Sequence, residues 1–60
     1  MTTFKELKEH SFFQDYVLEL EDLRGAKDSD EVAVIKNEYG EYEIELYREN
    51  ELMPYYTMVL

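Results

Sequence analysis

The stretch Glu41-Tyr42-Glu43-Ile44-Glu45-Leu46 alternates acidic and apolar side chains without a break. Successive side chains on a β-strand point to opposite faces, so this pattern predicts a strand with one apolar and one acidic face. We expect the apolar residues to face the core and the three glutamates to face solvent. A one-residue shift in register would bury the glutamates and expose the apolar set.

The residues before this stretch predict the other half of a hairpin. Residues 31–36, with the sequence Glu-Val-Ala-Val-Ile-Lys, are rich in β-branched side chains, which are typical of strands. Asn37 and Gly40 occupy the first and last positions of a type I turn that leads into a bulge. This turn returns the chain antiparallel, and the second strand is predicted over residues 41–48.

A third strand is predicted over residues 52–60, after a short turn in which Asn50 can adopt the left-handed conformation. Pro54 has no N–H group to donate to a neighbouring strand, which places this strand at an edge of the sheet. The three strands therefore form an antiparallel β-meander with residues 41–48 at its centre.

A short helix is predicted near the N-terminus. Thr3 is followed three residues later by Glu6, which is the spacing of a capping box and predicts a helix over residues 4–9. A break near His10 is required, because an unbroken helix would turn the apolar residues of its two halves toward different sides.

A second helix is predicted over residues 12–24. Ser11 and Gln14 have the spacing of another capping box, and Gly25 suits a C-terminal cap. Apolar residues recur at helical intervals at Phe13, Tyr16, Val17, Leu20 and Leu23. The same stretch also has apolar residues at alternate positions, and this alternative makes residues 15–23 a strand and leaves a single helix.

Length and composition define a single small acidic domain over residues 1–60. A chain of this length buries one thin core, and it has no cysteine that could add a disulfide or a thiolate zinc site. Its hydrophobic content of 45% is too high for a disordered acidic tail. The expected fold class is α+β, with one or two N-terminal helices packed on a three-stranded antiparallel sheet and a polar connection over residues 25–30.

The charge restricts the classes of partner. Fifteen acidic and six basic side chains give a formal net charge of −9. Phosphate backbones and anionic lipids repel such a surface, so direct nucleic-acid binding and membrane binding are not expected. The sequence has no leader-like or membrane-spanning apolar stretch, and an intracellular, cytoplasmic location is expected. A basic protein remains as the partner, including an enzyme whose basic groove holds nucleic acid.

Two acidic rows are the predicted contacts with such a partner. Alternate strand residues lie about 6.8 Å apart, so the glutamates of the central strand form a regular line of charge that can imitate a phosphate backbone. A second row follows the predicted second helix at spacings of four and three residues. The two rows comprise Glu38, Glu41, Glu43, Glu45, Asp15, Glu19 and Asp22. The alternative is that both rows are solvated surfaces that serve only solubility.

The tail over residues 52–60 carries no charge in a chain that is otherwise dense with charge. A half-exposed strand on a monomer should have one polar face. Either both faces of this strand are covered, or its edge pairs with a partner strand or with a second copy in a homodimer. The predicted contacts are Tyr55, Tyr56 and Met58.

Catalytic, metal and cofactor sites are not predicted. His10 is the only histidine and cysteine is absent, so no pair of nucleophile and base can be assembled. Residues 28–31 resemble the start of a calcium-binding loop. Ala33 and Tyr39, however, stand where that loop requires glycine and glutamate.

In size and charge the chain resembles small phage or mobile-element inhibitors of host nucleases. This resemblance implies an acidic inhibitor, not an enzyme, that occupies the nucleic-acid-binding surface of a basic protein. A second hypothesis is an assembly or regulatory subunit that docks through its uncharged third strand, with the acidity serving only solubility. Binding by the acidic rows should weaken as salt rises, whereas docking by an apolar strand should change little.

Overall fold

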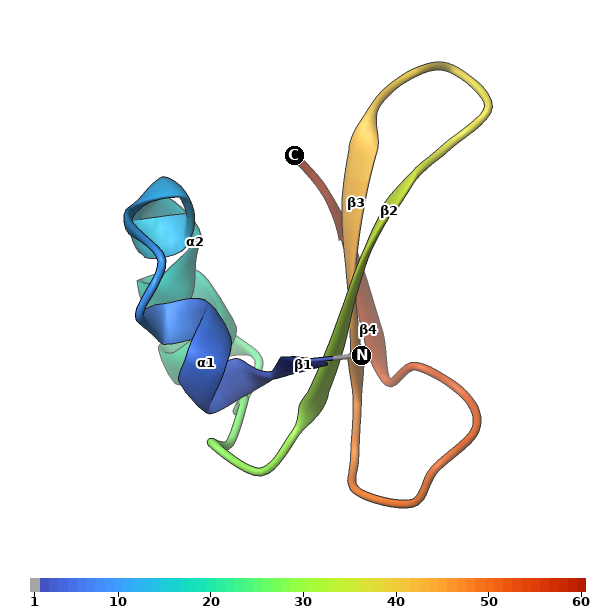
Figure 1. The fold of residues 1–60 in the computed structure, drawn as a ribbon. Coiled ribbons are helices and arrows are strands. Elements are labelled where there is room, and N and C mark those ends of the chain that lie inside the picture. Colours follow the sequence, from blue (N-terminus) through green and yellow to red (C-terminus); the bar gives the residue numbers. More distant parts are fainter. Residues whose placement is uncertain (1) are drawn as a thin grey trace.

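The computed structural model describes residues 2–60, which form two layers, with helices on one face of an antiparallel sheet (Figure 1). The sheet has the strand order β1-β2-β3-β4, and each neighbouring pair is antiparallel. The strands are β1 (Thr2–Thr3), β2 (Glu31–Lys36), β3 (Tyr42–Tyr47) and β4 (Tyr56–Val59). The predicted α+β class with an antiparallel sheet is confirmed, and β1 is an additional strand that the sequence pattern did not predict.

β2 and β3 form the predicted hairpin. In its turn, the side-chain oxygen of Asn37 accepts hydrogen bonds from the backbone N–H groups of Tyr39 and Glu41, each at 2.9 Å. Gly40 has φ +81°, in the left-handed region that favours glycine. The turn residues therefore set the register of the hairpin that carries the glutamates.

The helix α1 (Phe4–Lys8) begins with the predicted capping box. The Thr3 hydroxyl accepts a hydrogen bond from the backbone N–H of Glu6 at 3.3 Å, and the Glu6 carboxylate accepts one from the N–H of Thr3 at 3.4 Å. The Thr3 hydroxyl also donates to the Glu6 carboxylate at 3.0 Å, and the hydrogen bonds that this carboxylate accepts from Thr3 hold the pKa of Glu6 below its usual value. The helix ends before His10, where the predicted break lies.

A second helical run covers residues 11–23, which confirms the helical interpretation of this stretch over the strand alternative. It consists of a 3₁₀ turn, η1 (Ser11–Phe13), the helix α2 (Gln14–Leu18) and a π-helical turn, η2 (Glu19–Leu23). Gly25, with φ +70°, follows the run as predicted. Among residues 2–60, no helix has the length and apolar character needed to cross a lipid bilayer.

The predicted second capping box is wrong. His10, not Ser11, has the extended backbone of a residue that precedes a helical turn, with φ −89° and ψ 124°. Ser11 therefore lies inside the 3₁₀ turn, where its hydroxyl cannot cap. The Gln14 side-chain amide instead donates to the carbonyls of Lys8 at 2.6 Å and His10 at 3.1 Å, which ties the second helical run to the end of α1.

The core lies between the helices and the side of the sheet that faces them. Ile44 and Leu46 are buried there as predicted, and the same side of β2 contributes Val32. The buried hydrophobic residues are Phe4, Leu7, Leu20, Ala26, Val32, Ile44 and Leu46. Phe13, Tyr16 and Val17 of the second helical run pack partly against this cluster.

Two residues expected in the core are exposed. Tyr42 lies on the same side of β3 as Ile44, but 53% of it is exposed because the hairpin extends past the helices (Figure 1). Leu23 is 72% exposed. In η2, the N–H of Arg24 donates to the carbonyl of Glu19, five residues earlier, and this wider turn rotates Leu23 away from the core.

The C-terminal strand is shorter than predicted. β4 lies at an edge of the sheet, as Pro54 indicated, but residues 52–55 belong to the loop that precedes it. Asn50 has the expected positive φ of 67° in this loop. Leu52 and Met53 are 93% and 77% exposed. The uncharged tail is therefore divided between an exposed loop and a half-buried edge strand.

Candidate protein-binding surface

The side of the sheet that faces away from the helices carries the predicted row of glutamates, and its side chains are half-buried or exposed. We call it the outer face. The strand register places Ile35, Glu43 and Val59 in one row across it, and Ala33, Glu45 and Thr57 in the next. Glu31 and Tyr47 form the row beyond these. In the part of the chain that the structure describes, no other layer covers this face (Figure 1).

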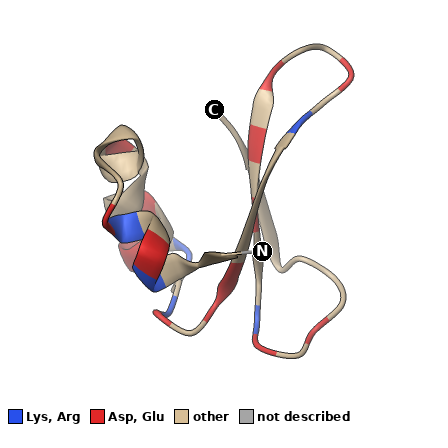
Figure 2. Cartoon of the chain, viewed as in Figure 1, with Lys and Arg blue, Asp and Glu red and all other residues tan. Residues whose placement is uncertain are grey.

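The outer face has carboxylates but no basic side chain from the described strands. Lys36 belongs to the helix-facing side of β2, and its ammonium lies 5.9 Å from the centre of the Tyr42 ring. Arg48, just after β3, turns toward the helix side, where it contacts Asp30. Figure 2 shows acidic segments on β3 as well as on the helices. The negative charge of the outer face is therefore not compensated by neighbouring strand residues.

Two glutamates of this face are held in place by hydrogen bonds. The Asn37 side-chain amide donates to the Glu43 carboxylate at 2.8 Å, and the Tyr47 hydroxyl donates to the Glu45 carboxylate at 2.9 Å. This second bond, together with burial, raises the pKa of Tyr47. Both glutamates are half-buried. Their positions are thus set by neighbours within the hairpin.

The other two predicted acids of the hairpin lie near its turn. Glu41 precedes β3 and is exposed, and its carboxylate accepts a long hydrogen bond, at 3.4 Å, from the Asn37 side chain. Glu38 is exposed within the turn. These two residues extend the acidic row of Glu43 and Glu45 toward the tip of the hairpin.

The helical acidic row lies in the other layer of the molecule. Asp15, Glu19 and Asp22 are exposed on α2 and η2. The core separates these helices from the outer face, so the two acidic rows do not form one continuous surface (Figure 2). A partner with a single flat basic surface can contact one row or the other.

β4 presents a free edge beside the outer face. The N–H of Leu60 donates to the carbonyl of Tyr42 at 2.8 Å. Because bonded residues alternate along an antiparallel ladder, Met58 also bonds to β3, while Thr57 and Val59 direct their N–H and C=O groups away from it. No further strand lies beyond β4 among residues 2–60. These backbone groups are available to another chain.

The three tail residues predicted as contacts are engaged within the chain. The Tyr55 hydroxyl donates a hydrogen bond to the buried carboxylate of Asp30. The guanidinium of Arg24 lies 4.5 Å from the centre of the Tyr56 ring, and Met58 packs partly against the core. The exposed side chains of β4 are those of the alternate residues of the strand.

Asp30 is a buried residue whose role the sequence did not reveal. Its side chain is 1% exposed, in a segment that we expected to be a polar connection. Its carboxylate accepts hydrogen bonds from the Lys27 N–H at 3.0 Å, the Arg48 guanidinium at 2.7 Å and the Tyr55 hydroxyl. The guanidinium also lies 4.0 Å from the centre of the Tyr55 ring. The carboxylate therefore joins the loop before β2 to both ends of the β3–β4 loop.

The electrostatics of this cluster follow from its hydrogen bonds. Burial alone would raise the pKa of the Asp30 carboxyl, but the hydrogen bonds that it accepts outweigh burial and hold the pKa below its usual value. Burial and the hydrogen bond to Asp30 raise the pKa of Tyr55. No local sequence pattern could have identified the cluster, because Arg48 and Tyr55 are 18 and 25 residues from Asp30.

The side chains that could bind a metal ion do not cluster in the part of the chain that the structure describes. Within residues 2–60, no group of three or more histidine, aspartate or glutamate side chains is placed to hold a metal ion. His10 is exposed, with its ring centre 6.4 Å from that of Phe13.

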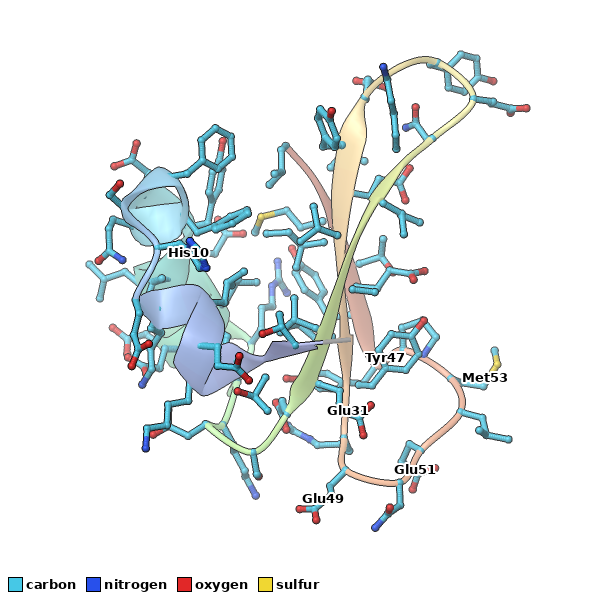
Figure 3. The ribbon with its side chains drawn as sticks, in the orientation of Figure 1. His10, Glu31, Tyr47, Glu49, Glu51 and Met53 are labelled. Carbon is cyan, nitrogen blue, oxygen red and sulfur yellow. The ribbon has the colours of Figure 1, made fainter. Side chains whose placement is uncertain are left out.

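Figure 3 labels His10 among the helices, and Glu49, Glu51 and Met53 on the loop between β3 and β4. An open, shallow depression near β1 is lined by Thr2, Thr3, Ser29, Glu31 and Glu49.

No protein-family model matches the chain, and no curated protein or solved structure shows significant similarity to it. The surfaces of this chain are therefore the basis for inferring its function.

Proposed function

We propose that this protein binds a basic surface of another protein through its outer face and thereby excludes nucleic acid from that surface. The observation that supports this proposal is the combination of Glu31, Glu43 and Glu45 on an uncovered sheet face to which the described strands contribute no lysine or arginine. The proposed class is a small acidic inhibitor of phage or mobile-element type.

The spacing of the charges supports nucleic-acid imitation. Glu43 and Glu45 are two residues apart on one strand, which corresponds to about 6.8 Å. On one strand of duplex DNA, neighbouring phosphates are separated by about 3.4 Å along the axis and lie farther apart through space because they wind around it, so the line of glutamates imitates a short stretch of one backbone. Exposed apolar side chains flank Glu43 in its row, with Ile35 on β2 and Val59 on β4. These give a protein partner contact area that a phosphate backbone does not offer.

Charge also argues for a protein as the direct partner. A surface of this sign repels phosphate groups, and the net charge of −9 extends that repulsion over the whole molecule. A groove that is rich in lysine and arginine attracts the same surface. The affinity should be greatest at low ionic strength, because salt screens charges separated by more than about 10 Å at 0.1 M.

The experiment is a displacement assay with a panel of purified nucleases and DNA-binding proteins that have basic grooves. A fluorescent DNA duplex is bound to each, and this protein is added while anisotropy reports release of the DNA. We expect displacement from at least one panel member at 50 mM salt and much weaker displacement at 300 mM. Failure to displace DNA from any basic protein, at either salt concentration, would argue against the proposal.

Two matched variants separate the outer face from net charge. The sheet variant carries Glu31→Gln, Glu43→Gln and Glu45→Gln, and the helix variant carries Asp15→Asn, Glu19→Gln and Asp22→Asn. Both remove three charges. We expect the sheet variant to displace DNA about tenfold less effectively, since surface ion pairs contribute roughly 0.5 kcal/mol each. The helix variant should remain close to the wild type. Equal losses in both variants would mean that net charge alone accounts for binding.

A further inference from the structure

We propose that the free edge of β4 receives an extended strand from the basic partner, with lysine or arginine at the two positions opposite Thr57 and Val59. The inference rests on the proposed function and specifies how the partner would engage this chain. The partner strand would become a fifth strand of the sheet, antiparallel to β4 like the other pairs.

The backbone of β4 favours the addition of a strand. Thr57 and Val59 each direct one N–H and one C=O away from β3, and both side chains are exposed. A strand that pairs with these residues satisfies four backbone groups at once. β4 carries no charge and no proline, the two features by which exposed edges commonly resist pairing.

The charge pattern beside the edge favours basic side chains on that strand. In an antiparallel ladder, partner residues opposite Thr57 and Val59 place their side chains on the outer face. Thr57 lies in the same row as Glu45, and Val59 in the same row as Glu43. The partner side chain and the glutamate are separated by two inter-strand spacings, about 10 Å. A long basic side chain reaches that far by lying across the intervening residue with its charged end toward the carboxylate.

The helix-facing side of the edge does not share this preference. There the Arg24 guanidinium lies over the Tyr56 ring, and the Tyr56 hydroxyl is 3.5 Å from the Glu19 carboxylate. Because Arg24 and Glu19 carry opposite charges, that side has no net attraction for a basic side chain. The edge therefore selects a strand in which basic residues alternate with uncharged ones.

The test uses two short peptides with blocked ends and the same composition. One has the order Thr-Lys-Val-Lys-Thr, with both lysines on one face of a strand, and the other has Thr-Val-Lys-Lys-Thr, with the lysines on opposite faces. Each is titrated into the ¹⁵N-labelled protein. We expect the first peptide to shift the Thr57 and Val59 amide signals and slow their hydrogen exchange, and to bind at least about tenfold more tightly than the second.

Proline tests the edge without removing bonds between β4 and β3. Thr57→Pro deletes an N–H that points away from β3, and Thr57→Ala is the control that keeps it. We expect Thr57→Pro to weaken binding of the first peptide at least about tenfold and Thr57→Ala to change it less than about twofold. Val59→Pro provides a second, independent variant if the first fails to fold. Equal binding by the folded proline variant and the alanine control would overturn the proposal.

Three further outcomes are decisive. If the Thr57 and Val59 amides of the free protein become protected as protein concentration rises, a second copy occupies the edge and the basic-strand proposal is wrong. If Thr57→Pro displaces DNA from the basic protein as well as the wild type does, while the sheet variant does not, the edge proposal fails and the proposed function stands. If the sheet variant displaces DNA normally, the proposed function fails instead.

Discussion

Replacing Asp30 by asparagine should destabilise the protein strongly, although the change removes only a charge. The carboxylate accepts three hydrogen bonds in a buried position. Hydrogen bonds to a charged group contribute about 1.5–3 kcal/mol, and those between neutral groups about 0.5–1.5 kcal/mol. The loss over three bonds is therefore about 3 kcal/mol, from which the easier burial of a neutral amide subtracts roughly 1 kcal/mol.

A net loss of about 2 kcal/mol is large for this chain. At roughly 0.05–0.15 kcal/mol per residue, a domain of this length has a total unfolding free energy of about 3–9 kcal/mol. For domains of this size, 1 kcal/mol corresponds to about 4–8 °C in Tm. We expect Asp30→Asn to lower the Tm by about 8–16 °C when unfolding is followed by far-UV circular dichroism at neutral pH.

Asp28→Asn is the matched control, because it makes the same chemical change two residues earlier. Asp28 is exposed and forms an ion pair with Lys8 at the surface, and exposed pairs contribute little to stability. The pKa of Asp30 is lowered in the folded state, so its contribution is present above the unfolded pKa and is lost as pH falls through the folded value. The wild type and Asp30→Asn should therefore converge in acid. An Asp30→Asn variant that melts with the wild type at neutral pH would refute this reasoning.

Three other predictions concern the helices and the alkaline range. Thr3→Ala should lower the free energy of unfolding by about 1 kcal/mol through loss of the cap of α1, measured by urea denaturation. Leu20→Ala should cost about 2–5 kcal/mol, whereas Leu23→Ala should change the urea midpoint little, although both fit the same helical pattern. Because the pKa of Tyr55 is raised in the folded state, stability should fall as pH rises above about 10. In a pH series of melting curves, Tyr55→Phe should show a shallower alkaline decline than the wild type.

Features that depend on neighbours in sequence were predictable. The hairpin turn at Asn37 and Gly40 and the capping box at Thr3 each consist of residues a few positions apart, and the structure contains both. The alternation in β3 likewise placed Glu43 and Glu45 opposite the core, since only that register buries Ile44 and Leu46. Local signals therefore supplied most of the fold and the central part of the candidate surface.

Features that depend on distant contacts were not predictable. Asp30 is buried because Arg48 and Tyr55, which are distant in the sequence, meet it at the end of the sheet where Glu31 pairs with Tyr47. The π-helical turn that exposes Leu23 leaves the apolar spacing unchanged, so the pattern could not show it.

The two edges of the sheet differ in a way that limits the size of any assembly. Among the residues that the structure describes, β1 pairs with the first two residues of β2, and Lys36 is exposed at the other end of that strand. A lysine on an edge strand discourages pairing, whereas β4 has no such residue. One strand can therefore add at β4, but the opposite edge is poorly suited to continue the sheet. Whether the added strand comes from a partner or from a second copy, growth should end after a single step, and the product is a closed complex and not a fibril.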